Sequence, residues 1–146
     1  MKKIICTFGI VALVFSSCKK YEDGPFMTMH TRSHRVIASW FVHAETEDGV
    51  DNTANFETQF QGYTVVITRD GTYARTYAVN GIFNYSEAGT WDWGSKKEHL
   101  LLTKSSSNSV TDWEIVELKE KEMKVRYTDY TANPNKVVEI TFTGVN

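Results

Sequence analysis

The chain has 146 residues, with 16 basic and 18 acidic side chains and a formal net charge of −2. This weak negative charge, without a basic run, argues against nucleic-acid binding, which depends on Lys and Arg that neutralise phosphates. Aromatic residues make up 13% of the chain and there are only two prolines, which favours a packed β domain over a disordered stalk. The length is sufficient for one domain with its own core.

The first 18 residues have the arrangement of a bacterial lipoprotein signal. Two lysines precede a 12-residue apolar run, Ile4 to Phe15, and Ser16-Ser17-Cys18 follows. This run is too short for a membrane-spanning helix, which takes about 20 residues, but it suits the apolar region of a signal peptide. We therefore predict a signal peptide over residues 1–17 and lipidation of the Cys18 thiol. The alternative is an ordinary secretory signal with an incidental cysteine.

Residues 18–34 are predicted to form a lipidated, flexible tether. Directly after Cys18 comes Lys19-Lys20-Tyr21-Glu22-Asp23-Gly24-Pro25, which resembles the start of surface lipoproteins of certain Gram-negative bacteria. The resemblance implies an outer-membrane, lipid-anchored protein exposed at the cell surface. A plain solvated linker has a similar composition. Because Cys6 leaves with the signal peptide and Cys18 is acylated, no disulfide is expected, and the fold must rely on packing alone.

Residues 35–146 are predicted to form eight short strands joined mostly by tight turns. Asp70-Gly71 and Asn80-Gly81 are hairpin signals, Asn133-Pro134-Asn135 is another turn, and Thr53 to Gln61 is either a short helix or an irregular cover. The break in alternation at Leu118 predicts a bulge or a strand end. The alternating residues, strand by strand, are Val36, Ala38, Trp40, Val42; Tyr63, Val65, Ile67; Tyr73, Arg75, Tyr77, Val79; Gly89, Trp91, Trp93; Leu100, Leu102; Trp113, Ile115; Met123, Val125, Tyr127; and Val138, Ile140, Phe142.

Strands joined by short turns are antiparallel neighbours. Eight of them, each with one apolar face, can close into an up-and-down barrel, so the predicted fold class is all-β, an eight-stranded antiparallel barrel. The interior of such a barrel is filled by side chains or holds one small ligand.

The predicted strands also resemble the lipocalin-like domains of Gram-negative surface lipoproteins. The residues that carry the resemblance are Trp40, the run from Tyr63 to Tyr73 ending in Asp70-Gly71-Thr72-Tyr73, Gly89-Thr90-Trp91, Leu100-Leu101-Leu102-Thr103, and Trp113-Glu114-Ile115 with Leu118. One departure is Ala38-Ser39-Trp40, where the family usually has a glycine before the tryptophan. The resemblance implies the fold more than a function, since most members have no established activity.

Metal-binding and catalytic patterns are weak. His30 and His34 have the spacing of two ligands on one helical turn, but nothing completes the set. The acidic loop from Glu45 to Asp51 lacks the spacing of a calcium-binding EF-hand loop. Glu114, Glu117 and Glu139 do not form a defensible pair for glycosidase chemistry, and no nucleophile elbow or phosphate loop is present. We expect no enzyme activity, no metal and no cofactor.

Aromatic and charged residues on the expected inward faces are the candidate ligand-binding residues: Trp40, Tyr73, Arg75, Tyr77, Trp91 and Trp113. Arg75 would suit an acidic head group, although at the barrel mouth it would simply reach solvent. Trp91 and Trp93 would stack on sugars if exposed, but large aromatics mostly fill cores. The sequence favours a non-enzymatic domain that binds a small, partly apolar ligand. The alternatives are a protein-interaction or inhibitor module of an envelope complex and a glycan-binding surface protein.

Overall fold

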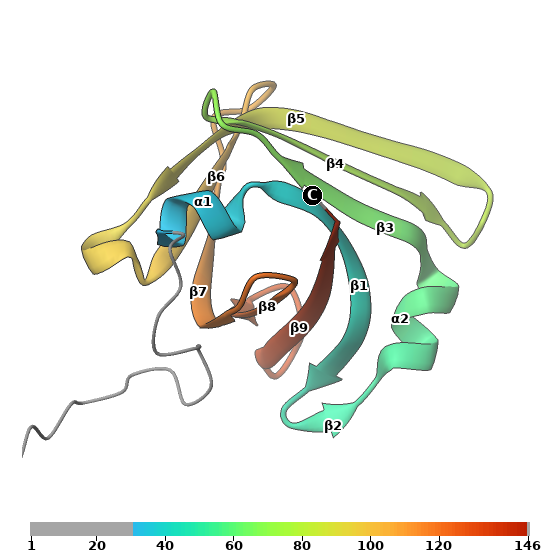
Figure 1. Cartoon of the computed structure of the whole chain (residues 1–146). Coiled ribbons are helices and arrows are strands. Elements are labelled where there is room, and N and C mark those ends of the chain that lie inside the picture. The colour runs from blue at the N-terminus through green and yellow to red at the C-terminus, as the bar shows by residue number, and fades with distance from the viewer. Residues whose placement is uncertain (1–30, 146) are drawn as a thin grey trace, which may run out of the picture.

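The computed structural model describes residues 31–145, which form a closed β-barrel with two short α-helices (Figure 1). The elements in order are α1 (Arg32–Val36), β1 (Ala38–Glu47), β2 (Val50–Asp51), α2 (Thr53–Gln59), β3 (Phe60–Ile67), β4 (Thr72–Val79), β5 (Phe83–Trp93), the 3₁₀ turn η1 (Ser95–Lys97), β6 (His99–Lys104), β7 (Val110–Leu118), β8 (Glu122–Asp129) and β9 (Lys136–Val145).

The barrel closes in chain order. Every strand pair is antiparallel, the order runs β1-β3-β4-β5-β6-β7-β8-β9, and β9 pairs back with β1, for example through Trp40 opposite Gly144. The two-residue strand β2 adds to the end of β1, with Val50 opposite Glu47. This topology confirms the predicted eight-stranded up-and-down barrel, and it is consistent with a lipocalin-like fold.

The predicted hairpin turns are present where the sequence placed them. Gly71 adopts a φ of +84°, and the Asp70 carboxylate accepts hydrogen bonds from the Thr72 backbone N–H (3.2 Å) and hydroxyl (2.9 Å). Asn80 and Gly81 both have positive φ angles, +48° and +68°, as tight hairpin turns that match the twist of the flanking strands require.

One half of the barrel interior is filled by a solid apolar core. Its largest fully buried side chains include Trp40, Leu100, Trp113, Met123 and Phe142. Helix α1 lies at this end of the barrel (Figure 1), and the carbonyl of its last residue accepts a 2.8 Å hydrogen bond from the Trp40 indole. We call this the closed end.

Helix α1 corrects two details of the sequence analysis. Arg32 to His34, expected in the tether, belong to the helix, and Val36, expected on the first strand, is its last residue. The physical reason is contact with the barrel, because Arg35 donates to the Leu118 carbonyl (2.7 Å), Arg32 donates to the Lys97 carbonyl (2.9 Å), and Ser33 accepts from the Trp93 indole (3.0 Å).

Three register shifts interrupt the strand ladders, one of them between Gln61 and Thr64 of β3, and the other two bear directly on the sequence predictions. The register between β7 and β8 shifts between Ile115 and Glu117, which leaves Leu118 buried and confirms the predicted break. A second shift, between Val42 and Ala44 of β1, was not expected, and it places Glu45 opposite Ile140 as a buried residue. Strand β5 also begins earlier than the alternating residues Gly89, Trp91 and Trp93 indicated, at Phe83, because it continues to pair with β4 as far as Val79.

Two seams of the barrel are incomplete, both at the end opposite α1. Strands β1 and β3 pair only from Ala38 opposite Ile67 to Phe41 opposite Thr64, and α2, one of the two alternatives expected for this segment, contacts both strands. Strands β7 and β8 pair only as far as Glu114 opposite Arg126. We call this end, which carries the loops at residues 80–82, 105–109 and 130–135, the open end.

Candidate functional site at the open end of the barrel

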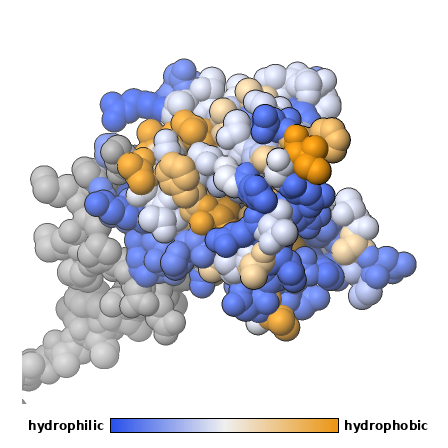
Figure 2. All heavy atoms as spheres, turned by 90° about the vertical axis from the view of Figure 1, so that its right-hand side faces the viewer, coloured by the Kyte–Doolittle hydropathy of each residue, from blue (hydrophilic) through white to orange (hydrophobic). Residues whose placement is uncertain are grey.

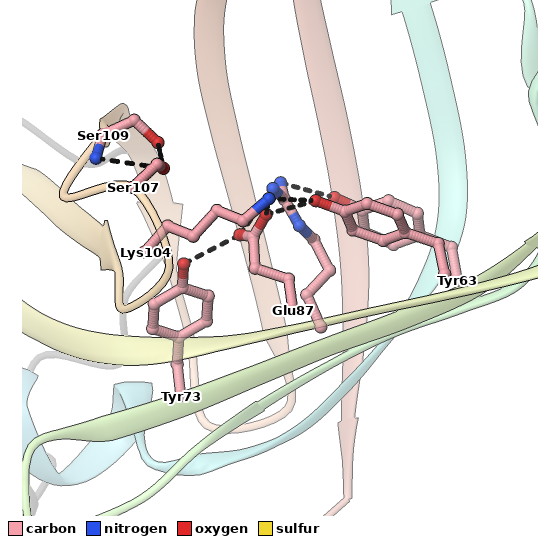
Figure 3. A network of polar contacts seen from close by, with 8 residues as sticks. Tyr63, Tyr73, Glu87, Lys104, Ser107 and Ser109 are labelled. Atoms are coloured by element: carbon pink, nitrogen blue, oxygen red, sulfur yellow. Dashed lines mark hydrogen bonds and ion pairs between the residues drawn. The ribbon is translucent and has the colours of Figure 1, made fainter.

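A buried carboxylate is the centre of a polar network in the open half of the barrel (Figure 3). The Glu87 side chain is only 4% exposed. Its Oε1 accepts hydrogen bonds from the Tyr73 hydroxyl (2.8 Å) and Arg75 Nη2 (2.7 Å), and its Oε2 accepts from the Tyr85 hydroxyl (2.6 Å). Lys104 Nζ lies 3.5 Å from Oε2 and donates to the Tyr85 hydroxyl at 3.0 Å. Four side chains thus contact the carboxylate, three through hydrogen bonds and Lys104 through an ion pair.

The register of neighbouring strands positions this network. Arg75 of β4 lies directly opposite Glu87 of β5, so the opposite charges form a cross-strand pair. Tyr73 lies opposite Gly89, and a Cβ at Gly89 would come within 2.8 Å of the tyrosine ring and 1.9 Å of the Thr103 carbonyl oxygen. The absence of a side chain at Gly89 therefore lets β5 and β6 approach closely and leaves room for Tyr73.

The hydrogen bonds keep the network charged. Burial by itself would raise the pKa of Glu87, but the hydrogen bonds from Tyr85, Tyr73 and Arg75 lower it to about 2. Burial opposes the charge of Arg75 as well, yet Tyr63 and Glu87 raise its pKa above the ordinary value. With Lys104 added, this network contains two cations and one carboxylate, an excess of one positive charge within the network at neutral pH.

A stack of aromatic rings lies beside the network. Tyr77 is stacked on Tyr85 (4.6 Å between ring centroids) and on Tyr63 (5.3 Å), and it meets the edge of Phe60 at 5.3 Å. The hydroxyl of Tyr63 accepts a 3.3 Å hydrogen bond from Arg75 Nη1. The guanidinium therefore has Glu87 as one partner and the aromatic stack as another, while its buried Nε has no hydrogen-bond partner among the described residues.

An apolar groove of about 310 Å³ opens at the incomplete seam between β1 and β3. It is lined by Phe41, Val42, Phe56, Phe60 and Tyr63 among others, and Phe41 is 43% exposed. Figure 2, which faces the side of the barrel that carries α2, shows apolar residues in separate patches among hydrophilic ones. The groove has the volume of a small ligand site, and Tyr63 connects it to Arg75.

A larger cleft of about 690 Å³ lies at the other incomplete seam, between β7 and β8. Its lining includes Tyr127, a half-buried residue that packs against the core. Burial raises the pKa of the Tyr127 hydroxyl, and the proximity of Tyr63 and Glu45 raises it further. This residue therefore connects the cleft to the polar interior of the open half.

Glu45 is the second buried carboxyl group of the described residues. Its exposed fraction is 2%, its pKa is raised chiefly by burial, and its Oε2 has no hydrogen-bond partner in the described part of the chain. The sequence placed Glu45 in a solvated loop, whereas the bulge in β1 turns it inward.

The structure divides the predicted ligand-binding residues into two groups. Tyr73, Arg75 and Tyr77 belong to the open-end network and its aromatic stack. Trp40 and Trp113, with exposed fractions of 0% and 1%, are core residues. Arg75 does not simply reach solvent at the mouth, because its side chain is 17% exposed and paired with Glu87.

Trp91 does not form an open sugar-binding platform with Trp93. The two rings are perpendicular, with centroids 6.0 Å apart, and both are half-buried against the core. Their indole N–H groups donate to the Thr68 carbonyl (2.8 Å) and to Ser33 Oγ (3.0 Å).

Sequence reasoning missed Glu87 and Lys104 as site residues. The signal for Glu87 was present, because it shares a strand face with Gly89 and Trp91, both of which were expected to face inward. A carboxylate on that face opposite Arg75 implies a buried ion pair. Lys104 follows the alternation of Leu100 and Leu102 in the same way.

The other candidate clusters separate in space. Among the acidic residues from the end of β1 to β2, Glu47 pairs with Lys136, Asp48 accepts from the Val137 N–H, and Asp51 binds Thr53. Within residues 31–145, no three His, Cys, Asp or Glu side chains come together as a metal site. His30 lies outside the described residues, so the pair with His34 has no geometry to report.

The three strand carboxylates considered for glycosidase chemistry have cationic partners. Arg126 binds Glu139 (Nε to Oε1, 2.8 Å) and Glu114 (3.5 Å), and Glu117 pairs with Lys119. These contacts fit a charged outer surface of the barrel.

Comparison with models of protein families produces no match for this sequence, and comparison with curated proteins produces none either. The predicted lipidation site, Cys18, lies outside the described residues. Over the described range, no helix combines the length and apolarity needed to cross a bilayer.

Proposed function

We propose that the chain is a lipid-anchored, non-enzymatic binding protein whose barrel holds a small, partly apolar ligand that carries an acidic group. The observation that carries this proposal is the position of Arg75, which contacts Tyr63 in the wall of the apolar groove and whose buried Nε has no hydrogen-bond partner within residues 31–145. The apolar part of the ligand would occupy the groove between β1 and β3. Its acidic group would lie toward the excess positive charge of Arg75 and Lys104.

The proposed cellular location rests on the leader sequence. Acylation of Cys18 would anchor the protein in the outer membrane, and the lysine-and-acid tag after it supports exposure at the cell surface. More than one acyl chain makes such anchoring stable, at about 0.8 kcal/mol for each buried methylene.

A fluorescent probe with an apolar ring system and a sulfonate, 1-anilinonaphthalene-8-sulfonate, tests the ligand class. We expect saturable binding that is weakened several-fold by Lys104→Met, because this side chain is 30% exposed and its removal leaves the Arg75–Glu87 pair intact. The matched control is Lys121→Met, at an exposed turn of the closed end. The uncharged probe N-phenyl-1-naphthylamine should bind both variants and the wild type equally.

Two further results would decide the question. Phe41→Ser, which removes an exposed apolar side chain from the groove, should weaken both probes. If Lys104→Met affects the charged and uncharged probes to the same extent, the proposed role of the positive charge is wrong. Native mass spectrometry of protein purified from its host should show a bound small molecule, and a clean apo mass would count against the proposal.

One observation favours the alternative of a protein-interaction module. Ile82 and Phe83, at the β4–β5 hairpin, are 73% and 71% exposed. Such side chains are typical of docking surfaces when they lie close together. Photo-crosslinking from position 82 in whole cells should then capture one stoichiometric envelope protein, and absence of a crosslinked partner would reject this alternative.

A further inference from the structure

The seam between β7 and β8 contains two strand edges that face each other without pairing. The last residue pair of this ladder toward the open end is Glu114 opposite Arg126. Beyond it, β7 continues back to Val110 and β8 continues to Asp129, each still paired on its other side. The cleft of about 690 Å³ occupies this gap, so the barrel wall is open along part of its height.

The direction of the backbone groups follows from the bonds on the outer sides of the two strands. The Ile115 N–H donates to the Glu98 carbonyl at 2.8 Å, so the odd-numbered residues of β7 bond toward β6. Since backbone groups alternate along a strand, Asp112 and Val110 present theirs to the gap.

The same argument applies to β8. The Gly144 N–H donates to the Lys121 carbonyl at 2.9 Å, and the register to β9 continues without a shift, so the odd-numbered residues of β8 bond toward β9. Thr128 therefore presents its N–H and carbonyl to the gap, opposite Asp112. Asp112 and Thr128 do not pair with each other, so an added strand can form backbone hydrogen bonds with both of them.

The side chains around the gap determine which strand would fit. Three carboxylates line it, on Asp112, Glu114 and Asp129, together with the basic side chains of Arg126 and His99. Arg126 binds Glu139 and lies 3.5 Å from Glu114, and His99 Nδ1 lies 2.7 Å from Asp112, so the carboxylates still outnumber the arginine. The pKa of Asp129 is lowered by its hydrogen bonds from Thr131, so this group stays ionised.

The aromatic residues of the cleft add to this preference for cations. Tyr130, which is 77% exposed, offers a ring face to a cation at the rim, and Tyr127 forms part of the wall toward the interior. An extended segment with alternating Lys or Arg side chains would satisfy the backbone edges and the carboxylates together.

We propose that the β7–β8 cleft binds an extended peptide segment rich in Lys or Arg, which adds as a strand at Asp112 and Thr128. This site is separate from the groove at the β1–β3 seam and does not depend on the proposed small ligand. The occupant is a basic peptide of a partner protein, recognised through its backbone and its charge.

Binding of three matched peptides to the full-length protein tests the proposal. The first is Lys-Val-Lys-Val-Lys with blocked ends, the second replaces each Lys by Glu, and the third carries N-methyl groups on the backbone of the lysine peptide. We expect saturable binding of the first, little binding of the second, and loss of binding of the third, because N-methylation removes the backbone donors. In NMR spectra, the amides of Asp112 and Thr128 should shift on binding.

A pair of variants separates this cleft from the other groove. Asp112→Asn with Glu114→Gln should weaken the lysine peptide by roughly threefold to tenfold, as expected for two partly exposed charge pairs. The control is Glu57→Gln, an exposed acid of α2 in the β1–β3 groove, which should leave affinity unchanged. Equal binding of the N-methylated peptide, shifts confined to the β1–β3 groove, or no saturable binding would overturn the proposal.

Discussion

Substitution of Glu87 by Gln tests whether the buried network depends on a charged carboxylate. The change keeps the size and shape of the side chain but removes the negative charge that Arg75, Tyr73 and Tyr85 surround. The Arg75 guanidinium would then be a buried cation without a counter-charge. Breaking a buried ion pair by removing one partner typically costs about 3–5 kcal/mol.

The pKa of Glu87 provides an independent magnitude. A carboxyl group whose pKa falls from its ordinary 4.5 to about 2 on folding contributes about 3 kcal/mol at pH 7. Because the pKa is lower in the folded state, this contribution is fully present above about pH 4.5 and is lost as the pH falls toward 2. The stability difference between the wild type and Glu87→Gln should therefore shrink to roughly half of its pH 7 value at pH 3.

Urea unfolding monitored by tryptophan fluorescence at pH 7 and pH 3 measures both quantities. The free energy of unfolding of the wild type should exceed that of Glu87→Gln by about 3 kcal/mol at pH 7 and by less at pH 3. Taking the difference between the two proteins cancels the titration of the other carboxyl groups. A double variant, Arg75→Met with Glu87→Leu, should recover part of the loss, because it removes the buried guanidinium and leaves only the partly exposed Lys104 without its carboxylate.

A difference in free energy of unfolding below about 1 kcal/mol at pH 7 would refute the reasoning, since it is less than the cost expected for breaking a buried ion pair. So would an excess of the same size at both pH values. In either case the carboxylate would not be held by the network as its four side-chain contacts imply.

Other substitutions test the core, the strand contacts and the anchor. Trp40→Phe removes the 2.8 Å hydrogen bond to Val36 and some buried volume, and should lower the free energy of unfolding by about 2 kcal/mol in urea. Gly89→Ala places a Cβ 1.9 Å from the Thr103 carbonyl oxygen and should abolish cooperative folding. The control, Ala88→Gly at the exposed neighbouring position, should lower the free energy of unfolding by about 1 kcal/mol or less. Thermal unfolding of both variants followed by circular dichroism measures the difference, and coinciding curves would contradict it. Cys18→Ser should move the protein from the membrane fraction to the aqueous extract, and a wild type found there with an unmodified residue 18 would disprove the anchor.

Much of the barrel was predictable because local patterns and long-range packing agree. Alternation of apolar residues, together with the turns at Asp70-Gly71 and Asn80-Gly81, predicted β3, β4 and their hairpins. The parity break at Leu118 predicted a bulge or a strand end, and β7 has a bulge just before Leu118, its last residue. An inward-facing residue that departs from the alternation requires one extra backbone residue.

Elements that depend on contacts with distant residues were less predictable. The five residues of α1 are too few to show a helical period, and the helix relies on contacts of Arg35 with Leu118 and of Ser33 with Trp93. The bulge in β1 follows from its register with β9, so nothing within β1 indicates that Glu45 turns inward.

The candidate site was partly within reach of the sequence. Tyr73, Arg75 and Tyr77 were found because they alternate on a strand next to a recognisable turn. Glu87 follows from the same alternation, but its importance appears only when the register sets it opposite Arg75. The solvent-facing position considered for Arg75 was wrong because the strand places it beside this buried carboxylate.

The amino-acid sequence by itself determined the number of strands in the barrel, their order and the closed antiparallel arrangement, because these depend on alternation and on short turns. Only the tertiary structure decided where neighbouring strands separate, and with it the groove beside α2 and the cleft beside Asp112. The physical reason is that a strand carries the same inward and outward pattern whether or not its edge is paired. The length of each ladder depends on the twist and bulges of both partners, which no single segment of the sequence contains.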